Sequence, residues 1–135
     1  MAIQFSTAVR NARLDAIDTT ISTAAVLKMF TGSPPSSTGV ADSGTKISSM
    51  NLPTDWLSNA ANGSKTLLGT WQDTSTVGSG TIGYFRIYAS NGTTVGMQGT
   101  VSSNGGSGDL KLNNNVVDVG QTISITTFTL TEGNP

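Results

Sequence analysis

Apolar residues near the start of the chain recur at the spacing of one helical face. Leu14, Ile17 and Ile21 stand at positions i, i+3 and i+7, and polar or charged residues separate them. Ser6 precedes this run and is a favourable N-cap, because its hydroxyl accepts a hydrogen bond from a free backbone N–H of the first turn. The pattern predicts one helix over residues 6–22.

Beyond residue 22 the pattern changes to short runs rich in β-branched and aromatic residues, separated by Gly, Pro, Asn and Ser. We expect strands at residues 24–30, 46–52, 81–89, 93–102, 110–112 and 122–131. The pattern predicts a mainly β fold, an antiparallel β-sandwich or barrel of jelly-roll-like type with one N-terminal α-helix. The length is that of a single domain, residues 1–135.

The clearest turn signal is the dipeptide Asn91-Gly92, which stands between two of the predicted strands. A two-residue type I′ turn needs a positive φ at both central positions, and Asn and Gly tolerate this best. We therefore expect a hairpin of residues 81–90 and 93–102 that turns at Asn91-Gly92.

The last predicted strand changes its apolar parity along its length. Ile123 and Ile125 share one face, whereas Phe128 and Leu130 have the other parity. A β-bulge at residues 126–127 returns all four side chains to one side, and burial on both faces is the alternative. The bulge is the favoured interpretation.

Two segments lack a regular period. Residues 31–45 form a loop of Ser, Thr, Gly and Pro, and residues 54–80 are irregular except for one helical turn expected at 54–57. The second segment contains Trp56 and Trp71, and burial stabilises each ring by about 25 cal/mol per Å² of apolar surface. We therefore expect residues 54–80 to lie over the sheet.

Charge is sparse, which narrows the choice of partners. Seven Lys and Arg oppose eight Asp and Glu, and the net charge is −1. Seven scattered cations are too few to form a basic face that neutralises several phosphates. We therefore expect no direct binding of nucleic acid and no polybasic membrane patch. The longest apolar stretches are too short to span a bilayer, and the N-terminus lacks the basic and apolar regions of a signal peptide.

The chain contains neither His nor Cys. This removes the commonest general base, the usual transition-metal ligand and all thiolate chemistry. The lysines are spread along the chain and are interpreted as ordinary surface residues; they are Lys28, Lys46, Lys65 and Lys111. We expect no enzymatic activity, no catalytic residue, no metal site and no cofactor.

A sugar-binding cleft is the sharpest alternative, because such clefts combine tryptophans with carboxylates. Asp55 and Asp73 stand beside Trp56 and Trp71 in the sequence. Buried rings and turn-capping carboxylates explain the same residues, and this interpretation is favoured.

Other polar groups also have a structural explanation. Asp15 and Asp18 lie on the predicted helix and are interpreted as solvated charges. Asp109, with Asn104 or Asn113, is a weak calcium candidate because EF-hand spacing is absent. The glycine clusters at 78–83 and 105–108 fail the context of a phosphate loop and are explained by turns.

Arg86 stands between Tyr84 and Tyr88 in the middle of a predicted strand. Alternation places the three side chains on one face, and Tyr and Arg are favoured in protein interfaces. This face is a candidate interface, and a solvent-facing side of the sheet is an equally good interpretation. Phe5, in the segment 1–5, is the fourth interface candidate.

Several stretches resemble a family of small proteins from tailed phages and prophages. The similar stretches are residues 5–15, 69–73, 85–94, 98–101, 105–106, 108–110 and 125–134, and together they extend over most of the chain. The resemblance implies a virion structural protein, assembled in the bacterial host cytoplasm, without catalytic residues.

Within a virion, this resemblance and the small β-rich body imply a head decoration or cement protein that stabilises the capsid. The implied partners are the major capsid protein or other virion proteins, and further copies of the chain in a homo-oligomer. Residues 1–5 and 31–45 are the expected extended contact segments. A tail or fibre component, including a carbohydrate-binding one that uses Trp56 or Trp71, is the alternative.

Overall fold

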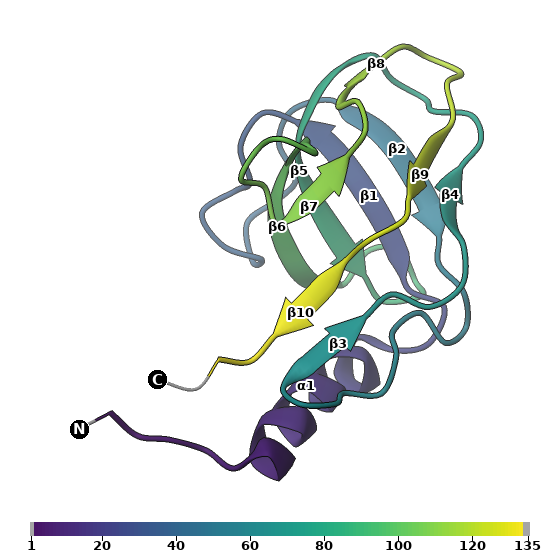
Figure 1. Ribbon diagram of the computed structural model, residues 1–135. Helices are drawn as coiled ribbons and strands as arrows, with labels where there is room; N and C mark the ends of the chain where they lie inside the picture. Colours follow the sequence, from purple (N-terminus) through teal and green to yellow (C-terminus); the bar gives the residue numbers. More distant parts are fainter. Residues whose placement is uncertain (1, 134–135) are drawn as a thin grey trace.

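The predicted helix forms at the N-terminal end of the computed structural model, which describes residues 2–133 (Figure 1). Helix α1 spans Thr7–Ile21, and the Ser6 hydroxyl accepts a hydrogen bond from the backbone N–H of Val9 at 3.3 Å. Leu14 and Ile21 are its buried residues. The helix and its N-cap are therefore confirmed.

The described residues after α1 form ten strands. These are β1 (Val26–Thr31), β2 (Lys46–Asn51), β3 (Ser64–Thr66), β4 (Trp71–Asp73), β5 (Gly80–Tyr88), β6 (Val95–Ser103), β7 (Leu110–Leu112), β8 (Val116–Val117), β9 (Ile123–Ile125) and β10 (Thr129–Thr131). The main sheet has the order β2-β1-β5-β6-β7, with β8 paired to β5. Two shorter pairs, β10-β3 and β4-β9, complete the sheet structure.

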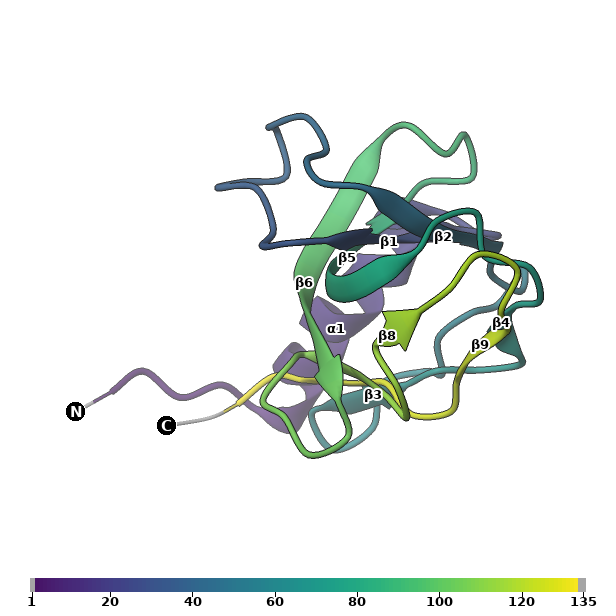
Figure 2. The same ribbon diagram turned by 90° about the horizontal axis from the view of Figure 1, so that it is seen from above.

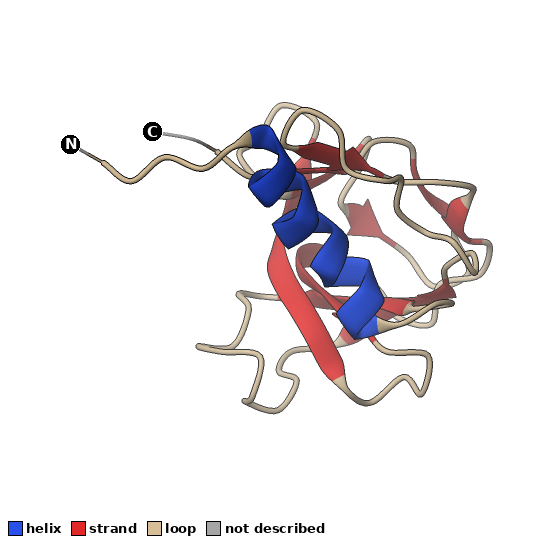
Figure 3. Ribbon diagram, turned by 90° about the horizontal axis from the view of Figure 1, so that it is seen from below, coloured by secondary structure: helices blue, strands red, loops and turns tan. Residues whose placement is uncertain are grey.

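The strands enclose the core in two layers. Figure 2 shows the main sheet on one side and β3, β4 and β9 on the other. Figure 3 shows α1 crossing the molecule beside β6. A Cβ on Gly96 of β6 would lie 2.4 Å from the side chain of Ile21, so the helix approaches this strand through a glycine. The mainly β, sandwich- or barrel-like fold with one N-terminal helix is confirmed.

Strands β6 and β7 depart from the antiparallel prediction. They run parallel, with Val101 opposite Leu110. The Asp109 carboxylate accepts hydrogen bonds from the backbone N–H and the hydroxyl of Thr100, each at 2.9 Å. The connecting loop is therefore held beside β6 before β7 begins, instead of reversing into a hairpin.

The two tryptophans lie at the centre of the fold, and each is 1% exposed. The ring of Trp71 is 6.0 Å from that of Trp56 and 5.5 Å from that of Phe128. Phe128 meets Phe85 of the main sheet edge-on at 5.8 Å. The prediction that residues 54–80 carry both tryptophans onto the sheet is therefore confirmed.

Residues 57–67 form a small hairpin that the apolar pattern did not reveal. Leu57 pairs with Leu67 in an isolated bridge, so the helical turn expected at 54–57 is wrong. The hairpin reverses at Asn62 and Gly63, whose φ angles are 52° and 72°. This is the two-residue turn with positive φ at both positions that an Asn-Gly dipeptide favours.

Strands β5 and β6 form the predicted hairpin, but their turn is longer than expected. Gly92 has a φ of 71°, whereas Asn91 does not have a positive φ. The N–H of Ala89 donates to the carbonyl of Thr94 at 2.9 Å and closes the loop. The Asn91 side chain accepts hydrogen bonds from the N–H groups of Thr93 and Thr94, which stabilises this wider turn. The predicted two-residue turn at Asn91-Gly92 is therefore wrong.

The last predicted strand is broken rather than bulged. Strand β9 pairs with β4, whereas β10 pairs with β3. Ile123, Ile125 and Phe128 are all buried, and Leu130 packs against the same core. The change of parity therefore marks the place where the chain leaves one strand pair for another.

Candidate functional site

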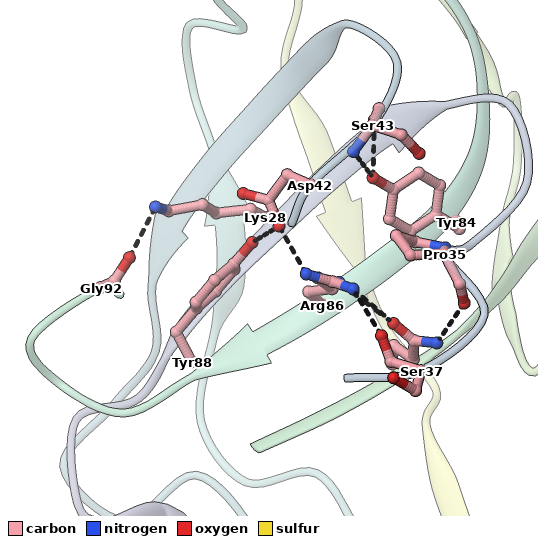
Figure 4. Close-up of polar contacts among 10 residues, drawn as sticks. Lys28, Pro35, Ser37, Asp42, Ser43, Tyr84, Arg86, Tyr88 and Gly92 are labelled. Carbon is pink, nitrogen blue, oxygen red and sulfur yellow. Dashed lines mark hydrogen bonds and ion pairs between the residues drawn. The ribbon is translucent and has the colours of Figure 1, made fainter. Parts of the chain in front are cut away.

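Arg86 lies beneath residues 32–45, the loop between β1 and β2, which we call the flap (Figure 4). Its guanidinium donates to the Asp42 carboxylate at 2.8 Å and to the Ser37 carbonyl at 3.1 Å. The Gln98 side-chain carbonyl accepts two further hydrogen bonds at 3.1 and 2.9 Å. The side chain is 1% exposed, so the flap and strand β6 enclose its charge completely.

The two neighbouring tyrosines are held by the same flap. The Tyr84 hydroxyl donates to the Ser43 carbonyl at 2.6 Å, and the Tyr88 hydroxyl donates to Asp42 at 2.6 Å. Burial and the hydrogen bond to Asp42 raise the pKa of the Tyr88 phenol above its usual range. Lys28 lies over the Tyr88 ring, 4.4 Å from the centroid, and donates to the carbonyl of Gly92 at 2.7 Å.

These contacts change the interpretation of the face that contains Tyr84, Arg86 and Tyr88. Their exposed fractions are 0%, 1% and 2%, so the interpretation as a solvent-facing side of the sheet is wrong. As candidate interface residues they are covered by the protein's own chain, because the flap supplies the partners that their polar groups need. The segment 31–45 is therefore folded onto the body, and the flap covers this face.

A second buried cation joins α1 to the small hairpin. The side chain of Lys65 is 1% exposed and forms ion pairs with Asp15, at 2.9 Å, and with Asp18. Asp15 also accepts from the N–H of Ala60 at 2.8 Å. Lys65 is thus not a surface lysine, and the two aspartates are not free solvated charges. The interpretation of Lys65 as a surface residue is wrong, because the hairpin at Asn62-Gly63 brings it against the helix. Asp15 pairs with Lys65 and still keeps 45% of its side chain exposed.

The pKa values of Asp15 and Lys65 reflect this ion pair. The hydrogen bond from Lys65, followed by the one from the Ala60 N–H, lowers the pKa of Asp15 from its usual value of 3.8. Burial by itself lowers the pKa of Lys65, but the hydrogen bonds that it donates to Asp18 and Asp15 outweigh burial and raise it. The charged forms of both groups are therefore the stable forms in the folded protein.

The proposed sugar-binding cleft does not form. Trp56 and Trp71 present no ring face to solvent, since they are buried against each other. The Asp73 carboxylate accepts from the Ser48 hydroxyl at 2.6 Å and from the Ser75 N–H at 3.0 Å. The two tryptophans and Asp73 therefore have structural roles. The hypothesis of a glycan-binding site on these rings is wrong.

The weak calcium candidate is likewise engaged in turns. Asp109 is bonded to Thr100, and Asn104 donates to the side-chain carbonyl of Asn113 at 2.7 Å. Within residues 2–133 no group of three or more metal-ligating acidic side chains comes together.

In the glycine cluster at 78–83, Gly83 is required by packing, because a Cβ there would lie 2.0 Å from the carbonyl oxygen of Gly32.

Most of the exposed large apolar side chains fall into two groups, and Val40 in the flap and Leu68 belong to neither. One group, which we call the proximal group, is formed by Ile3, Phe5 and Val9, which are 77%, 39% and 43% exposed. The other group, the distal valines, is formed by Val77, Val116 and Val119, which are 61%, 58% and 65% exposed. Figure 1 places β8, with the loops beside it, at the end opposite the chain termini.

The proximal group includes the interface candidate Phe5. Its ring lies against the guanidinium of Arg13, at 5.1 Å from the ring centroid, and remains partly exposed. Residues 2–6 have no helix or strand assignment and lead away from the body in all three ribbon views. Residue 1 of the predicted contact segment 1–5 lies outside the described residues.

The chain matches no protein-family model, no curated protein and no solved structure. No helix within residues 2–133 is long and apolar enough to cross a membrane.

Proposed function

We propose that the protein is a non-enzymatic structural subunit of a tailed-phage virion and that it decorates the head. In this role it binds neighbouring subunits of the major capsid protein and stabilises the shell. The sequence resemblance supports the virion assignment. The observation that carries the bridging role is the exposure of large apolar side chains at two opposite ends of one folded body.

The distribution of charge supports the same role. Arg86, Lys65, Asp15, Asp73 and Asp109 all hold loops or strands in place. The flap, the hairpin and the β6–β7 loop are thus tied to the body. A subunit that carries mechanical load between neighbours needs this kind of stiff body, since a loose one would yield before its contacts did.

Such a subunit stabilises the shell by mass action. A subunit that binds only the intact shell stabilises that shell by its binding free energy, summed over the sites that it occupies. Each contact can be modest, because attachment through two surfaces and through many copies multiplies the effect. Burial of one exposed valine at a joint contributes about 1–2 kcal/mol.

The test uses virions that lack the protein. They are expected to assemble but to release DNA at a lower temperature than complete virions, as followed with a DNA-binding dye. Adding the purified protein back is expected to restore the release temperature. The variant Val119→Asp, and deletion of residues 2–5, should restore it less well at the same concentration.

The matched control is Leu68→Asp, since Leu68 is 38% exposed and belongs to neither apolar group. It should restore the release temperature as the unmodified protein does. Particles that lack the protein and still keep full thermal stability would contradict the head assignment. If such particles also fail to attach to the host, the protein belongs to the tail.

A further inference from the structure

Strand β6 has an open outer edge over most of its length. Its inner edge pairs with β5, whereas β7 covers only residues 101–103 of the outer edge. The N–H of Thr100 points outward, because it donates to Asp109. Successive residues of an antiparallel strand alternate in direction, so the N–H of Gln98 points outward as well. The Asp109 carboxylate occupies the edge at Thr100, so residues 95–99 present the part of the edge that is available for pairing.

A seam separates this edge from β10. Strand β10 pairs with β3 on one side and shares no ladder with β6. A hollow of about 340 Å³ lies between the two strands. Its lining combines four apolar residues with four polar ones: Phe85, Met97, Phe128 and Leu130, and Gln98, Asp109, Thr129 and Thr131. Met97 also lines an adjoining hollow of about 410 Å³ between α1 and the start of β6, together with Ile17, Ile21 and Val95. The seam is therefore a groove along an open strand edge, mainly apolar beside α1 and of mixed polarity beside β10.

The N-terminal segment has the properties of a strand that fits such a groove. In residues 2–6 the apolar Ile3 and Phe5 alternate with Ala2, Gln4 and Ser6, so both large side chains fall on one side of an extended chain. The segment carries no charged side chain, and Asp109, the charged residue that lines the seam, already accepts hydrogen bonds from Thr100. Five extended residues span roughly 17 Å, which matches the length of the open edge at residues 95–99 of β6.

We infer that the seam receives residues 2–6 of a second copy of the chain. The added strand bonds to the outer edge of β6, and Ile3 and Phe5 enter the two hollows that meet at Met97. Phe5 exchanges its contact with Arg13 for the seam. Ile3, which is 77% exposed in one copy, becomes buried between two.

A second copy is the occupant because residues 2–6 lead away from their own body in the ribbon views and Ile3 is 77% exposed there. The Ser6 cap sets the direction in which the segment leaves α1, and the ribbon views show it leading away from the body. Each copy therefore offers a strand at one place and a seam at another. Such a contact is heterologous and joins copies in a ring or a chain. This inference rests on the proposed function, because it names a second copy of the chain as the partner of the proximal group within the virion.

Cysteine cross-linking tests the contact directly, because the chain has no cysteine of its own. Purified Ile3→Cys and affinity-tagged Met97→Cys proteins are mixed without virions and treated with a short bis-maleimide. We expect a covalent dimer that contains one chain of each kind. The matched control replaces Met97→Cys with Val77→Cys, which places the thiol among the distal valines and should leave only background product. Val95→Cys, in the same groove, serves if Met97→Cys lowers the unfolding temperature.

Sedimentation supplies the second measurement. The unmodified protein should self-associate, and Ile3→Asp should raise the dissociation constant about tenfold or more, since burial of the isoleucine is lost. Its unfolding temperature should not change. Equal cross-linking yields with the Val77→Cys control, or a monomer with no cross-linked product, would overturn the inference. An intrachain link in the Ile3→Cys/Met97→Cys double variant would do so as well.

The outcomes separate this inference from the proposed function. If the copies cross-link but the protein does not stabilise the particles, the contact between copies is supported and the head role is contradicted. Stabilised particles in which Ile3→Cys links only to the capsid protein retain the head role and overturn the contact between copies.

Discussion

The Arg86–Asp42 pair predicts an asymmetry between its two partners. The Arg86 side chain is 1% exposed, whereas the Asp42 side chain is 40% exposed. If Arg86 is replaced by Met, the carboxylate of Asp42 turns toward water. If Asp42 is replaced by Ala, the guanidinium stays buried without a counter-charge. The second change should therefore cost more stability than the first.

The expected magnitudes follow from burial. Removing one partner of a buried pair costs about 3–5 kcal/mol when the remaining charge stays buried. Asp42→Ala should fall near the lower value, about 3 kcal/mol, because the exposed side of the pair is screened by solvent. Arg86→Met keeps most of the apolar packing and loses only hydrogen bonds, which costs about 1–2 kcal/mol. The difference is thus on the order of 1 kcal/mol or more.

Urea unfolding at neutral pH measures the asymmetry. Tyr88→Phe is the control, because Asp42→Ala also removes the acceptor of the Tyr88 hydroxyl, a bond worth about 1 kcal/mol. After that value is subtracted, Asp42→Ala should still be at least as destabilising as Arg86→Met, and both should speed proteolysis within the flap. A larger loss for Arg86→Met would show that Arg86 contributes through packing, and the account of a buried charge held by the flap would be refuted.

Three further predictions concern separate parts of the molecule. Because the folded pKa of Asp15 is below 3.8, its pairing with Lys65 contributes stability above that pH and loses it as the pH falls through the folded value; Asp15→Asn should flatten the acid side of a plot of melting temperature against pH. Gly92→Val should cost more than about 1 kcal/mol in urea unfolding because φ is 71° there, whereas Gly105→Ala, in open space, should be near neutral. A chelator should leave the melting temperature unchanged, since Asp109 is already bonded to Thr100; a drop of many degrees would restore the calcium interpretation.

The sequence by itself determined the elements whose cause is local. The spacing of Leu14, Ile17 and Ile21 placed α1, and the Ser6 cap set its start. Alternating apolar runs located β1, β2, β5, β6 and β7, because side-chain period and turn chemistry act over a few residues. The Asn-Gly rule also applied, although it acted at Asn62-Gly63 and not at Asn91-Gly92.

The candidate site was predicted only in part. The three residues Tyr84, Arg86 and Tyr88 do share one face and one network, as their alternation indicated. Their burial was not predicted, since it depends on a loop without a periodic pattern. The exposed segment around Ile3 was expected as a contact segment, whereas the seam that we pair with it was not, because an open edge is visible only once the strand order is known.

Tertiary structure decided which polar groups are inside. Arg86 meets Asp42 across 44 residues of sequence, and Lys65 meets Asp15 across 50. A cation's own neighbours in the chain do not determine whether it is buried, because burial requires a counter-charge that a distant segment must supply. Local patterns therefore specify helices and strands, and only the packing of the whole chain specifies which charges those elements enclose.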